Sequence, residues 1–474
     1  MPPEIASLIF VILILGLFWA DRDPNLRTSK AFWIPTAWVL INASRPVSAW
    51  LTAFGYNVGP QKVTADIYIE GSPFDRAVYT TLVVAALVIL FGRRRQVGSL
   101  VRRNYAILLF FGYAAISMIW SDFPIVTLKH WTKSIGDLAM VLVVLTEPDI
   151  TAATKRLFSR VGFLLVPLSV LYCKYYPDIG RHMTKSWMNT YTGVTDQKNT
   201  LGWLCLLVGL GFLWRFLAAY RDRQGPNRSR RILAYGVILG MIVWLLHMSD
   251  SMTSFSSLVL AGTVMILANR PLFRRNPAAI HVLVAAVLGI TIFALFFDPT
   301  GSLLENLGRN RTLTGRTAIW THVLMVPFNR LVGVGYESFW LGDRLVQLQA
   351  AIGFDVNEAH NGYLEIFLNL GWIGVALLAL IIVTGYRKVI AALRASPEAG
   401  SLYLACFLAV LFANLTEACF RMLTITWIFF LFSILAASRS RVLEGLPAHV
   451  AAPTKNLARD EAQVGDVSLP QEVN

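Results

Sequence analysis

Most of this chain consists of apolar blocks whose length matches the thickness of a lipid bilayer. The first is IASLIFVILILGLFWA, residues 5–20, and similar blocks of about 15–22 residues recur to residue 437. Hydrophobic residues make up 55% of the 474 residues, charged residues only 15%, and the mean hydropathy is +0.56. A soluble domain of this size would carry more charge. The sequence therefore predicts an all-α, polytopic helical membrane protein.

The apolar blocks predict about 13 transmembrane helices. The first lacks a basic leader and a small-residue cleavage site, so we expect it to be retained rather than removed as a signal peptide. The chain then divides into spans one to ten (1–297), a large periplasmic loop with short helices (298–362), spans eleven to thirteen (363–437) and a disordered cytoplasmic tail (438–474). The predicted spans lie near 5–20, 32–54, 77–91, 105–120, 134–147, 157–172, 199–217, 232–248, 252–269, 279–297, 363–385, 401–417 and 423–437.

The distribution of Lys and Arg predicts which way the chain faces. Placing the connections GRRRQVGSLVRRN and RDRQGPNRSRR in the cytoplasm puts about 26 of the 42 Lys and Arg residues inside and about 14 outside. The N-terminus is then outside and the C-terminus inside. The outer cations concentrate in residues 173–198 and 298–362. Either they hold an anion outside the membrane, or long loops simply tolerate charge.

Some functional classes lack their usual sequence signatures. The four cysteines form no C-x-x-C pair and lie in or beside apolar blocks, which is typical of packing rather than of disulfides or zinc. There is no Walker loop, G-x-G-x-x-G turn or H-E-x-x-H helix. We therefore expect neither a metal nor another cofactor, and no nucleic acid partner.

The large outer loop carries its own helical pattern. In TLTGRTAIWTHVLMVPF, Thr314 is a candidate N-cap and Pro327 should end the helix. In SFWLGDRLVQLQAAIGF, apolar residues from Phe339 to Ile352 form one stripe, as in a helix that lies on the membrane interface. Gly333 and Gly335 permit a tight turn between the two. We expect a lid of two short helices against the membrane.

His360 stands in NEAHNGYLEIFLNLGWIGVAL, where the chain enters the membrane. At a helix N-terminus, free backbone N–H groups and the helix dipole disfavour a protonated ring. A histidine that stays neutral near pH 7 could act as a general base. The alternative is a hydrogen-bonded interface histidine, with Gly371 and Gly374 allowing close helix packing.

Two outer helix starts carry cations. Arg316 lies in the first turn of its predicted helix with Arg309 and Arg311 just upstream, an arrangement that suits a pyrophosphate. In TDQKNTLGW, Lys198 and Asn199 precede span seven, where the helix dipole repels a lysine unless an anion lies between them. Contacts with lipid headgroups are the alternative at both places.

Two further charged residues are weaker candidates. Arg45 lies in the outer half of span two before Pro46; an intramembrane arginine suggests function, although it could also reach the interface. Glu417, in NLTEACFR, lies near the outer end of span twelve and could pair with an arginine.

Several tracts together resemble one superfamily. HNGYLEIFLNLGWIG fits the pattern His-Asn, nine residues, Gly-x-x-Gly of the O-antigen ligase and polysaccharide polymerase superfamily, at His360, Asn361, Gly371 and Gly374. LTGRTAIW and GVGYESFW resemble the start of its signature domain. EGSPFDR, WSDFPIVTLKHW, TDQKNTLGW and NLTEACF resemble the exopolysaccharide polymerase branch. The resemblance covers nearly the whole chain except the tail.

The resemblance implies a metal-independent, inverting glycosyl transfer on the periplasmic face of the bacterial inner membrane. The donor is a glycan on undecaprenyl pyrophosphate, His360 is the base, and Arg316 holds the pyrophosphate. The family places an arginine before span seven, where this chain has Lys198, with Arg181 further off. A lysine binds phosphate without the bidentate fork. A flippase and a chain-length regulator of the same pathway are the expected protein partners, besides membrane lipids.

Three functions remain in competition. The leading prediction is an exopolysaccharide polymerase that joins lipid-linked repeats. A ligase would instead move finished glycan to lipid A–core or another acceptor. A flippase or transporter would show paired repeats, broken helices and charges at mid-bilayer. Because the ionisable residues gather at the outer surface, transport is the least favoured of the three.

Overall fold

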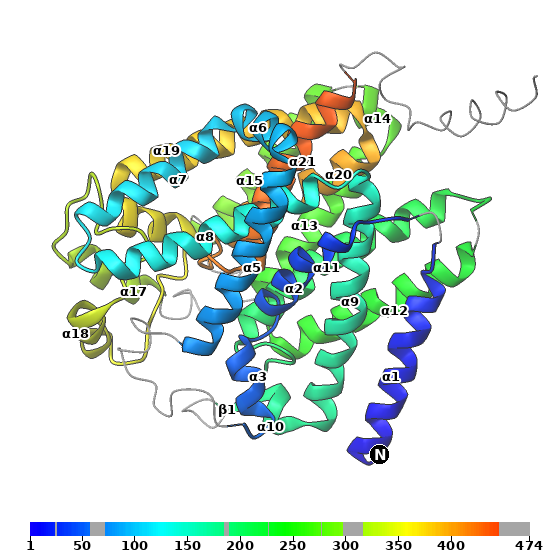
Figure 1. The fold of residues 1–474 in the computed structure, drawn as a ribbon, viewed down its shortest axis with the longest axis horizontal. Helices are drawn as coiled ribbons and strands as arrows, with labels where there is room; N and C mark the ends of the chain where they lie inside the picture. The colour runs from blue at the N-terminus through cyan, green and yellow to red at the C-terminus, as the bar shows by residue number, and fades with distance from the viewer. Residues whose placement is uncertain are drawn as a thin grey trace, which may run out of the picture.

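The computed structural model describes residues 1–23, 26–56, 72–183, 189–225, 227–275, 277–296 and 316–444 as a bundle of helices (Figure 1). One short antiparallel hairpin joins β1 (Arg181–Met183) to β2 (Asn189–Tyr191). The helices are α1 Pro3–Ala20, α2 Trp33–Asn42, α3 Val47–Ala53, α5 Pro73–Gly92, α6 Arg94–Arg103, α7 Tyr105–Ile116, α8 Pro124–Leu145, α9 Ile150–Tyr175, α10 Pro177–Gly180, α11 Lys198–Arg221, α12 Arg228–Ser249, α13 Met252–Ala268, α14 Pro271–Arg275, α15 Pro277–Phe296, α17 Arg316–Met325, α18 Gly342–Ile352, α19 Gly362–Ala395, α20 Pro397–Ala413 and α21 Ile425–Glu444.

The helices confirm a multi-pass helical membrane protein. Among the described residues, six helices are long and apolar enough to cross a bilayer, namely α1, α5, α9, α11, α12 and α19. Shorter apolar helices include α13, α20 and α21. Each predicted span coincides with a helix or with a pair of helices. The count of thirteen spans, their division into segments and the character of the tail stay predictions.

Two predicted spans differ from the structure. The span expected at 32–54 is two helices, because Pro46 cannot continue a helix and the chain turns between Asn42 and Val47. The span expected at 134–147 begins much earlier, at Pro124, where proline suits the first turn. Polar residues such as Lys129 and Lys133 are therefore part of α8.

The helix α19 is broken at Gly371, whose φ of +63° is left-handed. The break frees backbone groups that bond to the segment before α18: Trp372 N donates to Arg330 O at 2.9 Å, and Ile373 N to Leu331 O at 3.1 Å. A Cβ at Gly371 would lie 2.3 Å from the Leu331 carbonyl. Gly371 thus attaches the lid to α19, in addition to permitting close packing.

We expect Gly371→Ala to lower the free energy of unfolding by about 1–3 kcal/mol, because alanine is strained at this φ and meets the Leu331 backbone. Thermal unfolding of the purified protein in detergent measures the effect. Gly16→Ala is the control, since nothing lies within 4 Å of a Cβ there. Equal unfolding midpoints for the two variants would contradict this role for Gly371.

The lid contains the two predicted short helices, α17 and α18, which lie together at one side of the bundle (Figure 1). The predicted N-cap Thr314 lies outside the described residues. The apolar stripe from Phe339 to Ile352, which we expected to face the membrane interface, is largely buried inside the lid. Phe339 and Leu345 are buried against Ile319 of α17, so the stripe forms the lid's own core.

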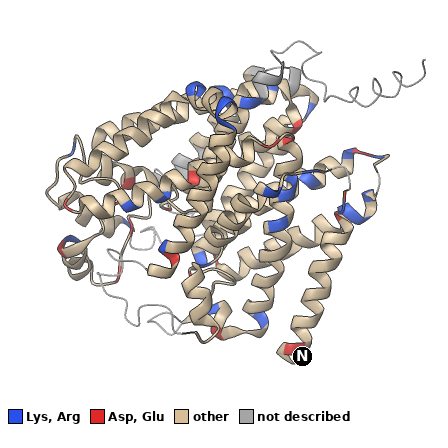
Figure 2. Cartoon of the chain, in the orientation of Figure 1, with Lys and Arg blue, Asp and Glu red and all other residues tan. Residues whose placement is uncertain are grey.

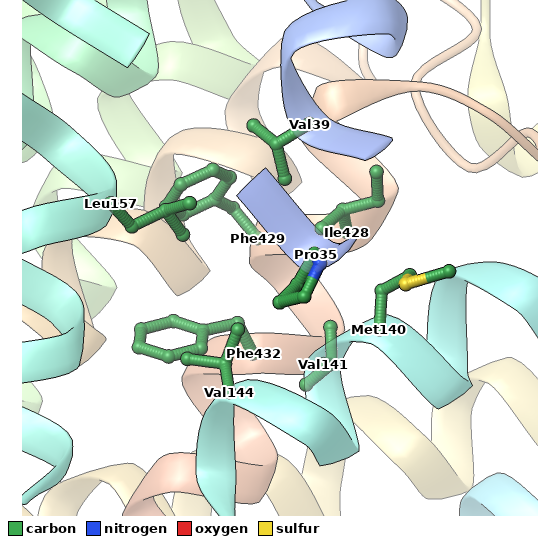
Figure 3. A pocket seen from close by; sticks show the side chains of 9 residues that line it. All are labelled: Pro35, Val39, Met140, Val141, Val144, Leu157, Ile428, Phe429 and Phe432. Carbon is green, nitrogen blue, oxygen red and sulfur yellow. The ribbon is translucent and has the colours of Figure 1, made fainter. Parts of the chain in front are cut away.

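The core of the bundle is closely packed. The cavity in Figure 3 lies between α2, α8, α9 and α21, holds about 10 Å³, and is lined by side chains such as Met140, Phe429 and Phe432. That volume is about enough for one water molecule. This apolar interior is therefore not a place for a sugar or a phosphate.

Candidate active site

Glu417 joins four separate segments at one end of the bundle. It lies in the loop between α20 and α21, and its side chain is only 4% exposed. Its Oε1 accepts from Arg316 Nη2 at 2.7 Å, at the start of α17. Its Oε2 accepts from Asn199 Nδ2 at 2.9 Å, at the start of α11, and lies 3.5 Å from His360 Nδ1, just before α19. The predicted pairing of Glu417 with an arginine is thus present.

His360 lies between two carboxylates. Its Nδ1 is 3.0 Å from Glu358 Oε1 and 3.5 Å from Glu417 Oε2, and its side chain is 30% exposed. The ring N–H is not aligned with either oxygen, so these contacts are ion pairs rather than well-directed hydrogen bonds. We call Glu358, His360 and Glu417 the trio.

The expectation of a neutral His360 is wrong. Burial lowers the pKa of the ring, but the contacts and charges of Glu358 and Glu417 outweigh this effect and raise the pKa to about 10. Burial raises the pKa of Glu358, but His360 and Arg421 outweigh it and lower that pKa. The ring is therefore an imidazolium near pH 7, because two nearby full charges exceed the partial charge of a helix end.

Sequence reasoning missed three members of the site: Glu358, Arg421 and Glu337. Arg421 Nη1 donates to Glu358 Oε2, and its Nε donates to Glu337 Oε2, both at 3.2 Å. The backbone oxygen of Glu337 in turn lies 3.1 Å from His130 Nδ1 on α8. Glu358 and Arg421 stand inside the tracts NEAHN and NLTEACFR, but nothing in their spacing predicts that these tracts meet.

Strained backbone concentrates at this site. Glu337, His360 and Leu423 all have left-handed φ, of 53°, 49° and 57°, although none is glycine. Buried Asp137 of α8 accepts from Leu423 N at 2.9 Å and from Trp38 Nε1 at 2.8 Å, which fixes the end of the Glu417 loop. Such strain persists only where surrounding contacts hold it, as at a preorganised site.

Asn361 acts as the N-cap of α19. Its Oδ1 accepts from the backbone N–H groups of Tyr363 and Leu364 at 3.0 Å, and its Nδ2 donates to Leu415 O at 3.2 Å. The amide thus ties the start of α19 to the Glu417 loop. This contact pattern gives Asn361 a positioning role at the start of α19, and a part for Asn361 in binding substrate stays a prediction.

The other predicted cations differ in position. Lys198 is the first residue of α11 and forms no ion pair with any other residue that the structure describes. Arg45 donates to the backbone oxygens of Thr195 and Ile179, so it holds the segment before α11.

Arg181 donates to Cys173 O at 2.9 Å and lies over the Tyr191 ring, within the hairpin. No contact of Arg45 or Arg181 with the trio is present among the described residues. Arg309 and Arg311 lie outside them.

The trio has a donor set that could also hold a metal ion, since its three ligand atoms lie within 4.8 Å of one another. Arg316 and Arg421, however, already pair with the same two carboxylates. A divalent cation would have to compete with two guanidinium groups and an imidazolium. This donor set fits a proton-sharing site better than a metal site.

These features define a multi-pass helical membrane protein in which a histidine, two glutamates and two arginines form ion pairs at one end of the bundle. Residues 237–379 match the O-antigen ligase family model. The chain is also 26% identical over 301 residues to the exopolysaccharide production protein ExoQ of Rhizobium meliloti (strain 1021), covering 60% of this chain and 65% of that protein. Together these findings support a relationship of this chain to the O-antigen ligase and polysaccharide polymerase superfamily. The matched region includes Arg316, Glu358 and His360 but ends before Glu417.

Proposed function

We propose that this protein is a membrane glycosyltransferase that joins undecaprenyl-pyrophosphate-linked oligosaccharide repeats into exopolysaccharide on the periplasmic face of the inner membrane. The observation that carries the proposal is the meeting of Arg316, Asn199 and His360 on Glu417. The relative's name places that protein in exopolysaccharide production, which is compatible with a polymerase, whereas the family description keeps a ligase as the second candidate.

The charges support an outward-facing site. Helix α6, between α5 and α7, carries four arginines, and Figure 2 shows blue segments about that end of the bundle. The lid and the trio lie where α8 and α19 begin. This is the end of the bundle opposite α6, because α7 runs from α6 toward the start of α8. Basic connections remain on the cytoplasmic side in most membrane proteins. The trio would therefore face the periplasm.

The reaction requires two tasks of this site. As the bond from the donor sugar to its diphosphate breaks, negative charge grows on the leaving oxygen. Arg316 and Lys198 would stabilise this charge in the transition state more than they stabilise the bound donor in the ground state. The attacking hydroxyl must also lose a proton. Because His360 is already protonated, the ring alone cannot accept the proton of the attacking hydroxyl. We therefore assign the acceptance of the hydroxyl proton to the whole trio, in which two carboxylates share one imidazolium. No step needs a metal ion.

The pH dependence of the reaction tests this assignment. The protonated ring is present well below the His360 pKa of about 10 and is lost as pH rises through it. We expect kcat/KM to be constant near neutral pH, to fall at acid pH as the carboxylates protonate, and to fall again near pH 10. Glu358→Gln removes one of the charges that raise the His360 pKa, so it should move the alkaline limb to lower pH.

A neutral histidine base would behave oppositely. Activity would then rise with pH through the His360 pKa, and such a rise would refute the shared-proton trio.

Reconstitution tests the function itself. Purified protein in detergent is given a lipid-linked repeat, with a chelator present, and products are separated by length. Longer chains and released polyprenyl diphosphate are expected. Their absence, together with movement of the lipid-linked glycan across vesicle membranes, would favour a flippase. Growth only when lipid A–core is added would favour the ligase.

A further inference from the structure

Helix α8 presents a second group of cations near the trio. Lys129 and Lys133 lie four residues apart, and therefore on one face of the helix, with His130 between them. Both are half-buried, and neither forms a hydrogen bond or an ion pair with another residue in the part of the chain that the structure describes.

A chain of contacts connects α8 to His360. The His130 ring contacts the backbone of Glu337, whose carboxylate pairs with Arg421. Arg421 pairs with Glu358, and Glu358 contacts His360. Arg316 lies at the other end of the same chain, through Glu417. Lys133 lies within electrostatic range of Glu337, near one end of this chain of contacts, and Arg316 lies at the other end.

The acidic groups near these lysines are already engaged. Asp75 and Glu337 are the carboxylates within electrostatic range of Lys133, and Arg76 and Lys129 are the cations. The carboxylate of Asp75 accepts from the backbone N–H and hydroxyl of Ser48. That of Glu337 is held by Arg421. Two like charges at this spacing repel each other, and a bound anion would relieve the repulsion.

We propose that Lys129 and Lys133 form a second phosphate-binding site, and that it holds the diphosphate of a lipid-linked acceptor. The inference rests on the proposed function. The acceptor hydroxyl forms a bond to C1 of the donor sugar, and the bond from C1 to the donor diphosphate breaks. The electron pair leaves with that diphosphate, and the hydroxyl proton goes to the trio. The acceptor's own diphosphate stays intact.

Two diphosphate sites distinguish a polymerase from a ligase. In a polymerase, donor and acceptor are both lipid-linked, so each needs a cationic site. A ligase that moves glycan to another acceptor needs only one. The α8 lysines therefore favour chain growth between two carrier-bound glycans.

The experiment uses the full-length protein in detergent. The donor is a lipid-linked repeat with its attacking hydroxyl capped, and the acceptor is the uncapped lipid-linked repeat. For the double variant Lys129→Gln/Lys133→Gln, we expect the KM for the acceptor to rise at least tenfold, with the KM for the donor unchanged. The same oligosaccharide without a diphosphate should be an equally poor acceptor for wild type and variant. Lys129→Arg/Lys133→Arg should restore the acceptor KM.

Controls separate the possible failures. Lys174→Gln/Arg223→Gln removes two exposed positive charges elsewhere and should leave the acceptor KM unchanged. If the wild type makes no longer chains, the proposed function fails. If the wild type is active but the double variant keeps a normal acceptor KM, only the second site is refuted. In that case, loss of one bound phosphatidylglycerol in native mass spectrometry would identify the lysines as a phospholipid headgroup site.

Discussion

His360→Ala is expected to reduce kcat at least about 100-fold while the protein still folds and inserts, since acid–base groups typically contribute this much or more. The substitution removes the cation that Glu358 and Glu417 share. Each carboxylate keeps its guanidinium partner, Arg421 for Glu358 and Arg316 for Glu417, but the group that links the two carboxylates and shares their proton is gone. Polymer yield in cells that lack the native gene and turnover of the purified variant both measure the loss.

His281→Ala is the matched control, because that ring is exposed and its Nδ1 bonds to the Tyr386 hydroxyl on the later part of α19, away from the trio. It should retain normal turnover. Normal polymer yield from His360→Ala would remove the trio from the mechanism.

Arg316→Ala should have an effect of similar size on the release of polyprenyl diphosphate, about 100- to 1,000-fold in kcat, as for the loss of a single preorganised donor. The variant also removes the guanidinium that pairs with buried Glu417 and leaves only the His360 ring, 3.5 Å away, as a nearby cation, which can cost up to about 3–5 kcal/mol of stability. Arg316→Lys and Arg316→Ala/Glu417→Gln are therefore measured together with Arg316→Ala, because neither of these variants leaves Glu417 as a buried carboxylate that has lost its Arg316 partner.

The lysine variant keeps the charge but loses the guanidinium fork, so it should be intermediate. If the double variant folds and releases diphosphate at the wild-type rate, Arg316 does not hold the donor.

The sequence predicted what local patterns determine. Apolar blocks of bilayer length gave the helices, and the spacing around Arg316 and along 338–354 gave the two lid helices. The position of Glu417 near the end of a predicted span also allowed us to predict that it pairs with an arginine, and the structure shows this pairing with Arg316. In each case neighbouring residues, or the end of a helix, carry the information.

The charge of His360 could not be predicted in the same way. The helix end is a local feature, but Glu417 is remote in sequence and reaches the ring only through the packing of α19 against α20. Arg421 and Glu337 were missed for the same reason, because they meet across the bundle and the lid. Gly371 was predicted only to allow close helix packing. Its left-handed backbone lets the lid bond to α19, and this conformation could not be predicted because it depends on the position of Leu331, which is remote from Gly371 in the sequence.

In the proposed reaction, a donor diphosphate binds beside the trio at one end of the bundle. A cryo-electron microscopy structure with a phosphonate analogue of the lipid-linked donor tests it most directly. We expect the diphosphate within hydrogen-bond distance of Arg316 and Lys198, with C1 of the sugar facing Glu358 and His360. A diphosphate bound beside α6, or a sugar outside reach of the trio, would contradict it.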